Sequence, residues 1–184
     1  VAEIEPGFAK GTDEHSGETP TAPSGKIQAG AAYVSTLINA LMQSPYWKDS
    51  VFILTWDEIG GFYDHVPPQP MPSPDGITPS DLRPNDICTQ STGPNCDFIF
   101  TGFRVPLIGV SPFTKKHYVS HTVADYTAIT KLIETRFGLP TLTWRDAAQM
   151  DMTEFFDFVN EPWLVPPTPP AQPTNLPCEY TKLQ

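Results

Sequence analysis

Cysteine, basic side chains and long apolar runs are all scarce in this sequence of 184 residues. Its three cysteines match no zinc–cysteine spacing. Lys and Arg total 11 against 21 Asp and Glu, and the net charge of −10 argues against nucleic acid or an anionic membrane surface as an electrostatic partner. No apolar run approaches the ~20 residues that a membrane-spanning helix needs, so we expect no transmembrane segment.

The remaining composition is that of a globular domain with a sizeable core, because the length and the hydrophobic content of 39% are both ordinary. The chain begins at Val1 without a visible signal peptide, as a mature secreted protein or an internal fragment would. The negative charge does not exclude a phosphate substrate, since a bound metal can supply positive charge locally.

Two segments have the apolar periodicity of a helix. Residues 26–43 are expected to end at Ser44-Pro45, because proline disfavours helix in the residue before it. Residues 122–137 open with a candidate capping box of Thr122 and Asp125 and close at Gly138. The buried stripe expected for this second helix consists of Tyr126, Ile129, Ile133 and Phe137.

Three segments have the composition of strands: residues 51–56, 98–100 and 105–110. The run 51–56 is apolar at nearly every position, which is typical of a strand inside a parallel sheet covered by helices. Pro106 is expected at a strand start or an edge. These patterns predict the α/β class with a mainly parallel sheet, and so few strands leave edges that need further partners.

A proline-rich stretch, residues 66–97, is expected to form a long surface insertion. Cys88 and Cys96 flank a polar loop within it, and they predict a short disulfide in an extracellular setting; two free thiols in a cytosolic loop are the alternative. Cys178 is left over in a second proline-rich segment, the tail 161–184, and its partner is open.

Asp57 and Glu58 come directly after the strand 51–56. Ligands bind beyond the carboxyl ends of strands in open α/β sheets, and adjacent carboxylates repel each other unless a cation neutralises them. Gly60-Gly61 allows a sharp turn close to a ligand. The pattern therefore indicates a divalent metal site, with a solvated acidic turn as the alternative.

A series of motifs in fixed order resembles the phosphoesterase family, which contains bacterial phospholipases C and acid phosphatases and has an alkaline-phosphatase-like fold. The resemblance covers roughly residues 10 to 160, although Ser16 replaces the proline of the family's Asp-Glu-His-Pro segment. The motifs are Asp13-Glu14-His15, Ser44-Pro45-x-Trp47, Trp56-Asp57-Glu58-x-Gly60-Gly61-x-Tyr63-Asp64-His65-Val66-x-Pro68, Gly102-x-Arg104-Val105-Pro106, Ser111-Pro112, His121-Thr122, Ile133-Glu134-x-Arg136-Phe137-Gly138-Leu139-Pro140 and Arg145-Asp146-Ala147.

The resemblance implies roles for several of these residues. Asp57 and Glu58 would bind the active-site metal, whose identity stays open. His15 would act as a catalytic and substrate-binding residue beside the phosphate, against the plainer role of a solvated loop histidine. His65 either lines the site or pins the turn by hydrogen bonding. Arg104 faces either the substrate phosphate or one of the chain's many acids.

The implied function is hydrolysis of a phosphate ester, of phospholipase C or acid phosphatase type, through a metal-assisted covalent phospho-enzyme. The family's Ser or Thr nucleophile comes from well before Asp13, so we expect it in an N-terminal segment or chain absent here. Residues 1–160 would then be the C-terminal portion of a secreted phosphoesterase domain, followed by the tail 161–184. The rival is a non-catalytic fragment or accessory binding protein that retains the scaffold.

Overall fold

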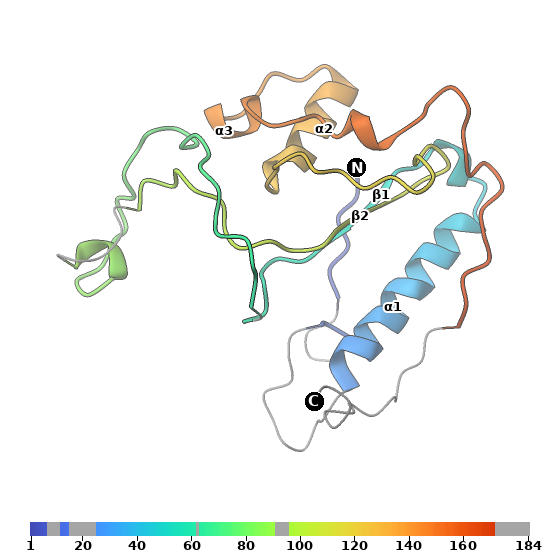
Figure 1. The fold of residues 1–184 in the computed structure, drawn as a ribbon, viewed down its shortest axis with the longest axis horizontal. Helices are drawn as coiled ribbons and strands as arrows, with labels where there is room; N and C mark the ends of the chain where they lie inside the picture. The colour runs from blue at the N-terminus through green and yellow to red at the C-terminus, as the bar shows by residue number, and fades with distance from the viewer. Residues whose placement is uncertain (7–11, 15–24, 62, 91–95, 172–184) are drawn as a thin grey trace. The chain divides into compact units, whose positions relative to one another are not determined.

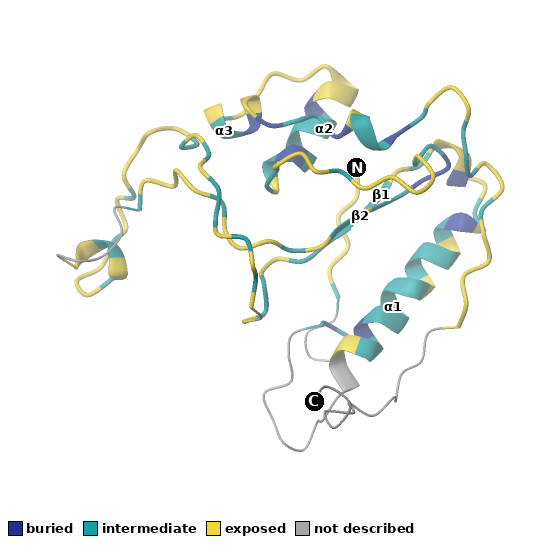
Figure 2. Cartoon of the chain, viewed as in Figure 1, coloured by how far each residue is buried: buried dark blue, intermediate teal, exposed yellow. Residues whose placement is uncertain are grey.

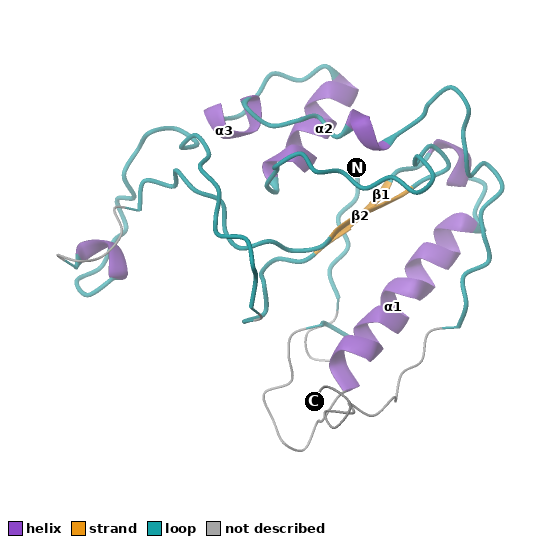
Figure 3. Cartoon of the chain, viewed as in Figure 1, coloured by secondary structure: helices purple, strands orange, loops and turns teal. Residues whose placement is uncertain are grey.

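The computed structural model describes residues 1–6, 12–14, 25–61, 63–90 and 96–171 (Figure 1). Loops make up most of this described chain, with a few helices and two short strands between them (Figure 3). The described residues fall into two units, one drawn from Val1–Trp56, Leu107–Thr114 and Phe158–Gln184 and the other from Asp57–Pro106 and Lys115–Asp157. No helix in the described ranges is both long and apolar enough to cross a membrane.

Helix α1 (Gly25–Met42) dominates the first unit and confirms the helix expected over residues 26–43. Ser44 closes it, since its amide and its hydroxyl both donate to the Leu41 carbonyl, at 3.0 and 2.8 Å. The 3₁₀ helix η2 (Trp47–Asp49) follows, and its buried Trp47 indole donates to the Trp163 carbonyl at 3.0 Å. Trp47 therefore ties the end of α1 to the segment that opens the proline-rich tail.

Strands β1 (Phe52–Thr55) and β2 (Leu107–Val110) pair in antiparallel register, with Phe52 opposite Val110 and Thr55 opposite Leu107. The structure mixes helices with a small antiparallel sheet, which is compatible with the α/β class. The parallel neighbours expected for residues 51–56 are not among the described strands. All four residues of β1 are half-buried rather than buried, so its apolar sequence does not reflect complete cover on both faces. Pro106 lies just before β2, as expected for a residue that lacks an N–H.

Helices α2 (Thr127–Phe137) and α3 (Trp144–Ala147) pack together in the second unit. Helix α2 starts later than the expected residue 122, because the Asp125 carboxylate accepts from the Thr127 amide at 2.8 Å and turns the chain there. Gly138 ends α2 in the left-handed conformation, at a φ of 64°, as predicted. The capping box lies at α3, where Thr143 and Asp146 satisfy each other's backbone amides.

The buried face of α2 differs from the stripe that its sequence predicts. Tyr126 and Phe137 are 46% and 56% exposed, whereas Ala128 and Glu134 are buried. Figure 2 shows buried residues on α2, on the chain around α3 and on the chain that follows α3. Ile129 and Ile133 of the predicted stripe are half-buried, so apolar periodicity misplaced Tyr126 and Phe137 and did not indicate the buried Glu134.

The insertion is held at its base by the chain's own backbone and by one arginine. Its two legs meet in an isolated bridge between Pro70 and Phe100, flanked by a bond from the Met71 amide to the Ile99 carbonyl at 2.7 Å. The strand expected at 98–100 is thus reduced to this bridge, because the opposing prolines have no N–H to extend a ladder. Arg145 donates to the carbonyls of Phe98 and Phe100, at 2.6 and 3.0 Å.

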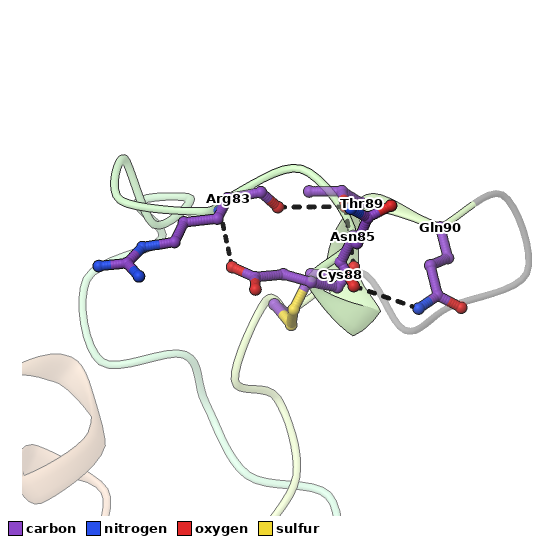
Figure 4. The surroundings of a disulfide bond; sticks show 7 residues. Arg83, Asn85, Cys88, Thr89 and Gln90 are labelled. Carbon is purple, nitrogen blue, oxygen red and sulfur yellow. Dashed lines mark hydrogen bonds between the residues drawn. A yellow bond between two sulfur atoms is a disulfide. The ribbon is translucent and has the colours of Figure 1, made fainter.

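The structure places Cys88 and Cys96 beside each other near the tip of the insertion, with their Cα atoms 5.6 Å apart (Figure 4). This placement is compatible with the disulfide that the sequence predicts, and the disulfide itself stays a prediction. Cys88 lies in the 3₁₀ helix η3 (Ile87–Thr89). The turn before it is closed by the Asp86 carboxylate, which accepts from the Arg83 amide at 2.7 Å. Cys178, whose partner the sequence leaves open, lies outside the described residues.

Peptide mapping without reducing agent should recover a peptide that joins Cys88 to Cys96. Cross-linking so short a loop stabilises by about 2–3 kcal/mol in the chain-entropy account. The double variant Cys88→Ser/Cys96→Ser should therefore be cut faster by protease within residues 66–97. Cys178→Ser is the matched control and should leave the linked peptide in place. Free thiols at both positions in the native protein would reject the pairing.

Candidate functional site

The turn after β1 exposes two consecutive carboxylates. Asp57 and Glu58 are both exposed, and both belong to the second unit. Gly60 and Gly61 follow at φ values of 69° and 76°, in the left-handed region that glycine enters without a steric penalty. A Cβ at Gly61 would meet nothing within 4 Å, so the backbone conformation rather than space selects glycine there. The sharp glycine turn expected after the acids is confirmed.

Tyr126 connects this turn to the start of α2. Its hydroxyl donates to the Asp57 carbonyl oxygen at 2.9 Å. Burial raises the pKa of the Tyr126 hydroxyl, and the charges of Asp57 and Glu58 raise it further, which is consistent with a phenol close to both carboxylates. Sequence reasoning assigned Tyr126 to a buried apolar stripe and missed this contact. No local signal identifies it, because its partner is 69 residues away in the chain.

Asp64 and Arg104 form an ion pair at the far side of the glycine turn. The Arg104 guanidinium approaches the Asp64 carboxylate to 2.6 Å, and the Arg104 amide donates to it at 3.2 Å. The hydrogen bond from the Arg104 side chain holds the pKa of Asp64 far below its ordinary value. The sequence allowed Arg104 to face either the substrate phosphate or an acid of the chain. In the structure Arg104 forms an ion pair with an acid of the chain, Asp64.

His65 is exposed, and its ring meets the Tyr63 ring edge-on at a centroid distance of 5.1 Å. The turn at this point is pinned by Asp64, whose carboxylate accepts from the Val66 amide at 3.1 Å. The sequence left open whether His65 pins this turn by hydrogen bonding. In the structure, Asp64 makes the hydrogen bond that pins it. An exposed imidazole on a fixed turn is free to meet a ligand, so the site-lining role stays a prediction.

The Asp13-Glu14 segment lies in the first unit. Glu14 accepts from the Trp56 indole at 2.7 Å, and Gly30 of α1 lets the segment lie close, since a Cβ there would come within 3.1 Å of the Thr12 carbonyl oxygen. Asp13 is 8% exposed, and its Oδ1 has no hydrogen-bond partner. His15, the residue predicted to contact the phosphate, lies outside the described residues.

The donor set of the acidic turn suits a hard divalent cation in part. Carboxylate oxygens are the ligands that such cations prefer, and both side chains are accessible on a turn held at its base. No group of three or more His, Cys, Asp or Glu in the described ranges is arranged to hold a metal ion. Asp57 and Glu58 thus fit as part of a ligand set, with the remaining positions to be filled from elsewhere.

Comparison with known proteins finds similar sequences among phospholipases C of several organisms. Phospholipase C B of Mycobacterium tuberculosis is 35% identical over 147 residues, which cover 76% of this chain and 27% of that protein. The hemolytic phospholipase C of Pseudomonas aeruginosa is 38% identical over 133 residues, 70% of this chain and 18% of the relative. Non-specific phospholipase C1 of Arabidopsis thaliana is 31% identical over 152 residues, 76% and 26% respectively.

These alignments span about a quarter or less of each curated relative. The sequence model of the Phosphoesterase family matches residues 11–140, which is more than half of this chain. The match includes the Asp13-Glu14 segment, the acidic turn with its two glycines, the Asp64–Arg104 pair and the whole of α2. The chain therefore belongs to the Phosphoesterase family.

Proposed function

We propose that the protein to which this chain belongs hydrolyses phosphate ester bonds. The observation that carries the proposal is the exposed Asp57–Glu58 turn within a family match over residues 11–140. A scaffold gains nothing from two adjacent exposed acids, because they repel each other. A cation bound beside a phosphate ester would neutralise the two acids, whereas the rival role of an accessory binding protein does not explain why they are adjacent.

The proposed route has two displacements. An enzyme hydroxyl attacks phosphorus, the ester P–O bond breaks, and the departing alcohol takes a proton. Water then attacks the phospho-enzyme, which restores the hydroxyl and releases the phosphoryl product. Dividing one difficult step into two in this way is the usual gain from a covalent intermediate. We assign the nucleophile to no residue of this chain.

Asp57 and Glu58 are proposed as metal ligands, and a divalent cation held there would neutralise negative charge on the phosphoryl group. The Asp64–Arg104 pair lies beyond the two glycines and fixes the chain on that side of the acidic turn. His65, exposed on the same turn, is proposed to contact the substrate. His15 is proposed to touch the phosphoryl oxygens, on the strength of its place in the Asp13-Glu14-His15 motif.

Phospholipids are the favoured substrates within this class. The relatives named above are phospholipases C, and none of them is named as a phosphatase. An acidic chain suits a zwitterionic phospholipid better than an anionic one, because a net charge of −10 repels an anionic lipid surface. We therefore propose a phosphodiester of the choline phospholipid kind as the preferred substrate.

A substrate panel on the full-length protein tests this function. Phosphatidylcholine vesicles should release the phosphorylated headgroup, and an aryl phosphate monoester should be turned over at least about 10-fold more slowly, judged by kcat/KM. EDTA should remove the activity, and one of Mg²⁺, Ca²⁺, Mn²⁺ or Zn²⁺ should restore it. Preference for the monoester would assign an acid phosphatase instead. Absence of turnover on every ester would favour the accessory-protein role.

A further inference from the structure

Tyr126 is the residue that reaches the acidic turn from a distant part of the chain. It stands just before α2 and is 46% exposed, so its ring is not held as a core residue. Its hydroxyl donates to the Asp57 carbonyl oxygen at 2.9 Å across a separation of 69 residues. The hydroxyl of this partly exposed tyrosine donates its hydrogen bond to a loop carbonyl, so we expect the bond to restrict the conformation of that loop.

The loop in question needs such a contact. Gly60 and Gly61 give the backbone after the acids conformational freedom that other residues lack, and a Cβ at Gly61 would touch nothing. The charges on Asp57 and Glu58 also push the two side chains apart. Without an anchor, the turn would sample many conformations, and a cation would have to order it on binding.

The hydrogen bond from Tyr126 fixes the peptide plane between Asp57 and Glu58, because that plane contains the Asp57 carbonyl. Fixing it restricts ψ of Asp57 and φ of Glu58, the two torsions that set where the carboxylates point relative to each other. Groups that orient metal ligands in this indirect way are worth about 10–100-fold in metal affinity.

We propose that Tyr126 is a positioning residue whose hydroxyl holds the Asp57–Glu58 turn ready for a divalent cation. The proposal rests on the metal-binding role proposed above for these two acids. Tyr126 itself need not touch the metal or the substrate. Its position at the start of α2 makes the helix a rigid support for the turn, which is how sites of this kind keep their geometry.

Tyr126→Phe tests the hydroxyl alone, since the ring remains. Mg²⁺, Ca²⁺, Mn²⁺ and Zn²⁺ are titrated in turn into the metal-free full-length protein by calorimetry, and the melting temperature of the metal-free protein is recorded beside them. The variant should bind the tightest of these cations about 10-fold more weakly. Its metal-free melting temperature should stay close to that of the native protein. Tyr46→Phe, at an exposed tyrosine of the first unit, is the matched control and should change neither value.

The outcomes distinguish the role proposed for Tyr126 from the metal-binding role proposed for Asp57 and Glu58. Equal affinity in Tyr126→Phe and the native protein, while Asp57→Ala loses the cation, overturns the role of Tyr126 and leaves the metal site standing. A large drop in the metal-free melting temperature of Tyr126→Phe also overturns it, in favour of a purely structural bond. A native protein whose cation binding does not depend on Asp57 overturns both proposals.

Discussion

Asp57→Ala should remove the bound divalent metal from the full-length protein and lower its phosphoesterase activity by on the order of 100-fold or more. The variant removes one of the two adjacent carboxylates that the turn exposes, and with it half of the proposed ligands on this turn. Glu58→Gln should have a similar effect, because an amide oxygen is a much weaker ligand for a cation than a carboxylate. Metal content by elemental analysis and kcat/KM on phosphatidylcholine are the measurements.

Asp57→Ala should not lower the stability of the metal-free protein. Asp57 and Glu58 are exposed neighbours of like charge, and the Tyr126 bond goes to the Asp57 backbone, which alanine keeps. Without metal, Asp57→Ala should therefore unfold at the same temperature as the native protein or slightly above it. Asp49→Ala is the matched control, because Asp49 is an exposed acid whose ion pair with Lys48, at 4.0 Å, contributes little.

Undiminished metal content in Asp57→Ala would contradict the assignment of the metal ligands. A variant that loses activity because it no longer folds would contradict it as well, since the turn would then be a structural feature. Loss of metal and activity in a fully folded protein is the result that the exposed geometry predicts.

The second large effect concerns two buried carboxyl groups at the corner between α2 and α3. Glu134 is 4% exposed and Asp146 is 1% exposed. Both accept from the Leu142 amide, at 3.2 and 2.9 Å, so the two groups meet at one donor. Glu134 Oε2 is buried and has no hydrogen-bond partner, and the Lys131 ammonium forms an ion pair with it at 3.9 Å. Two buried carboxyl groups this close make it harder for both to be charged at once.

The pKa values of the two groups shift in opposite directions. Burial raises the pKa of Glu134, and its hydrogen bond with Asp146 raises it further. Burial also opposes the charge of Asp146, but hydrogen bonds from Thr143, from Glu134 and from the Leu142 amide outweigh it and lower the pKa to about 2. Glu134 is thus the weaker acid of the two, and Asp146, the stronger acid, also accepts from the Thr143 amide in the capping box of α3.

Glu134→Gln should change how stability depends on pH. A carboxyl with a raised pKa stabilises the folded state fully below its ordinary value of 4.5, and this contribution is lost as the pH rises through the higher folded value. The native protein should therefore lose stability relative to Glu134→Gln as the pH rises above 4.5, until the raised folded-state pKa of Glu134 has been passed. The lowered pKa of Asp146 adds no slope there, since its contribution is lost only below its ordinary value of 3.8.

Urea unfolding at several pH values measures the difference, and Glu3→Gln, at an exposed glutamate, is the control that should run parallel to the native protein. At pH 7, Asp146→Ala should cost about 2–3 kcal/mol, because it removes the N3 half of the α3 capping box and takes one acceptor from each of the Leu142 and Thr143 amides. A constant offset between Glu134→Gln and the native protein above pH 4.5 would show that folding does not raise the pKa of Glu134.

Much of the local structure follows from the sequence. The end of α1 at Ser44-Pro45, the left-handed Gly138, the position of Pro106 before β2 and the pairing of Cys88 with Cys96 were all predicted. Each depends on the conformational limits of one residue or on a short separation along the chain. The acidic turn followed by two glycines is a signal of the same kind, and family membership agrees with it.

Other features were decided only when distant segments met. The apolar run of β1 did not reveal that its described neighbour is antiparallel. The periodicity of α2 placed Tyr126 in the core, because spacing cannot show that its hydroxyl reaches the Asp57 carbonyl. Arg145 could have paired with any of the chain's acids, and it pairs with Asp125 and also donates to the carbonyls of Phe98 and Phe100, just after the insertion.

The sequence by itself therefore determined where α1 and α2 end, which acids follow the strand, and to which family the chain belongs. Tertiary structure alone decided where α2 begins, which buried carboxyl groups lie together, and which tyrosine contacts the acidic turn. The physical reason is one of range. Capping, proline and glycine act through torsions of adjacent residues, whereas a hydrogen bond across 69 residues exists only after the chain has folded.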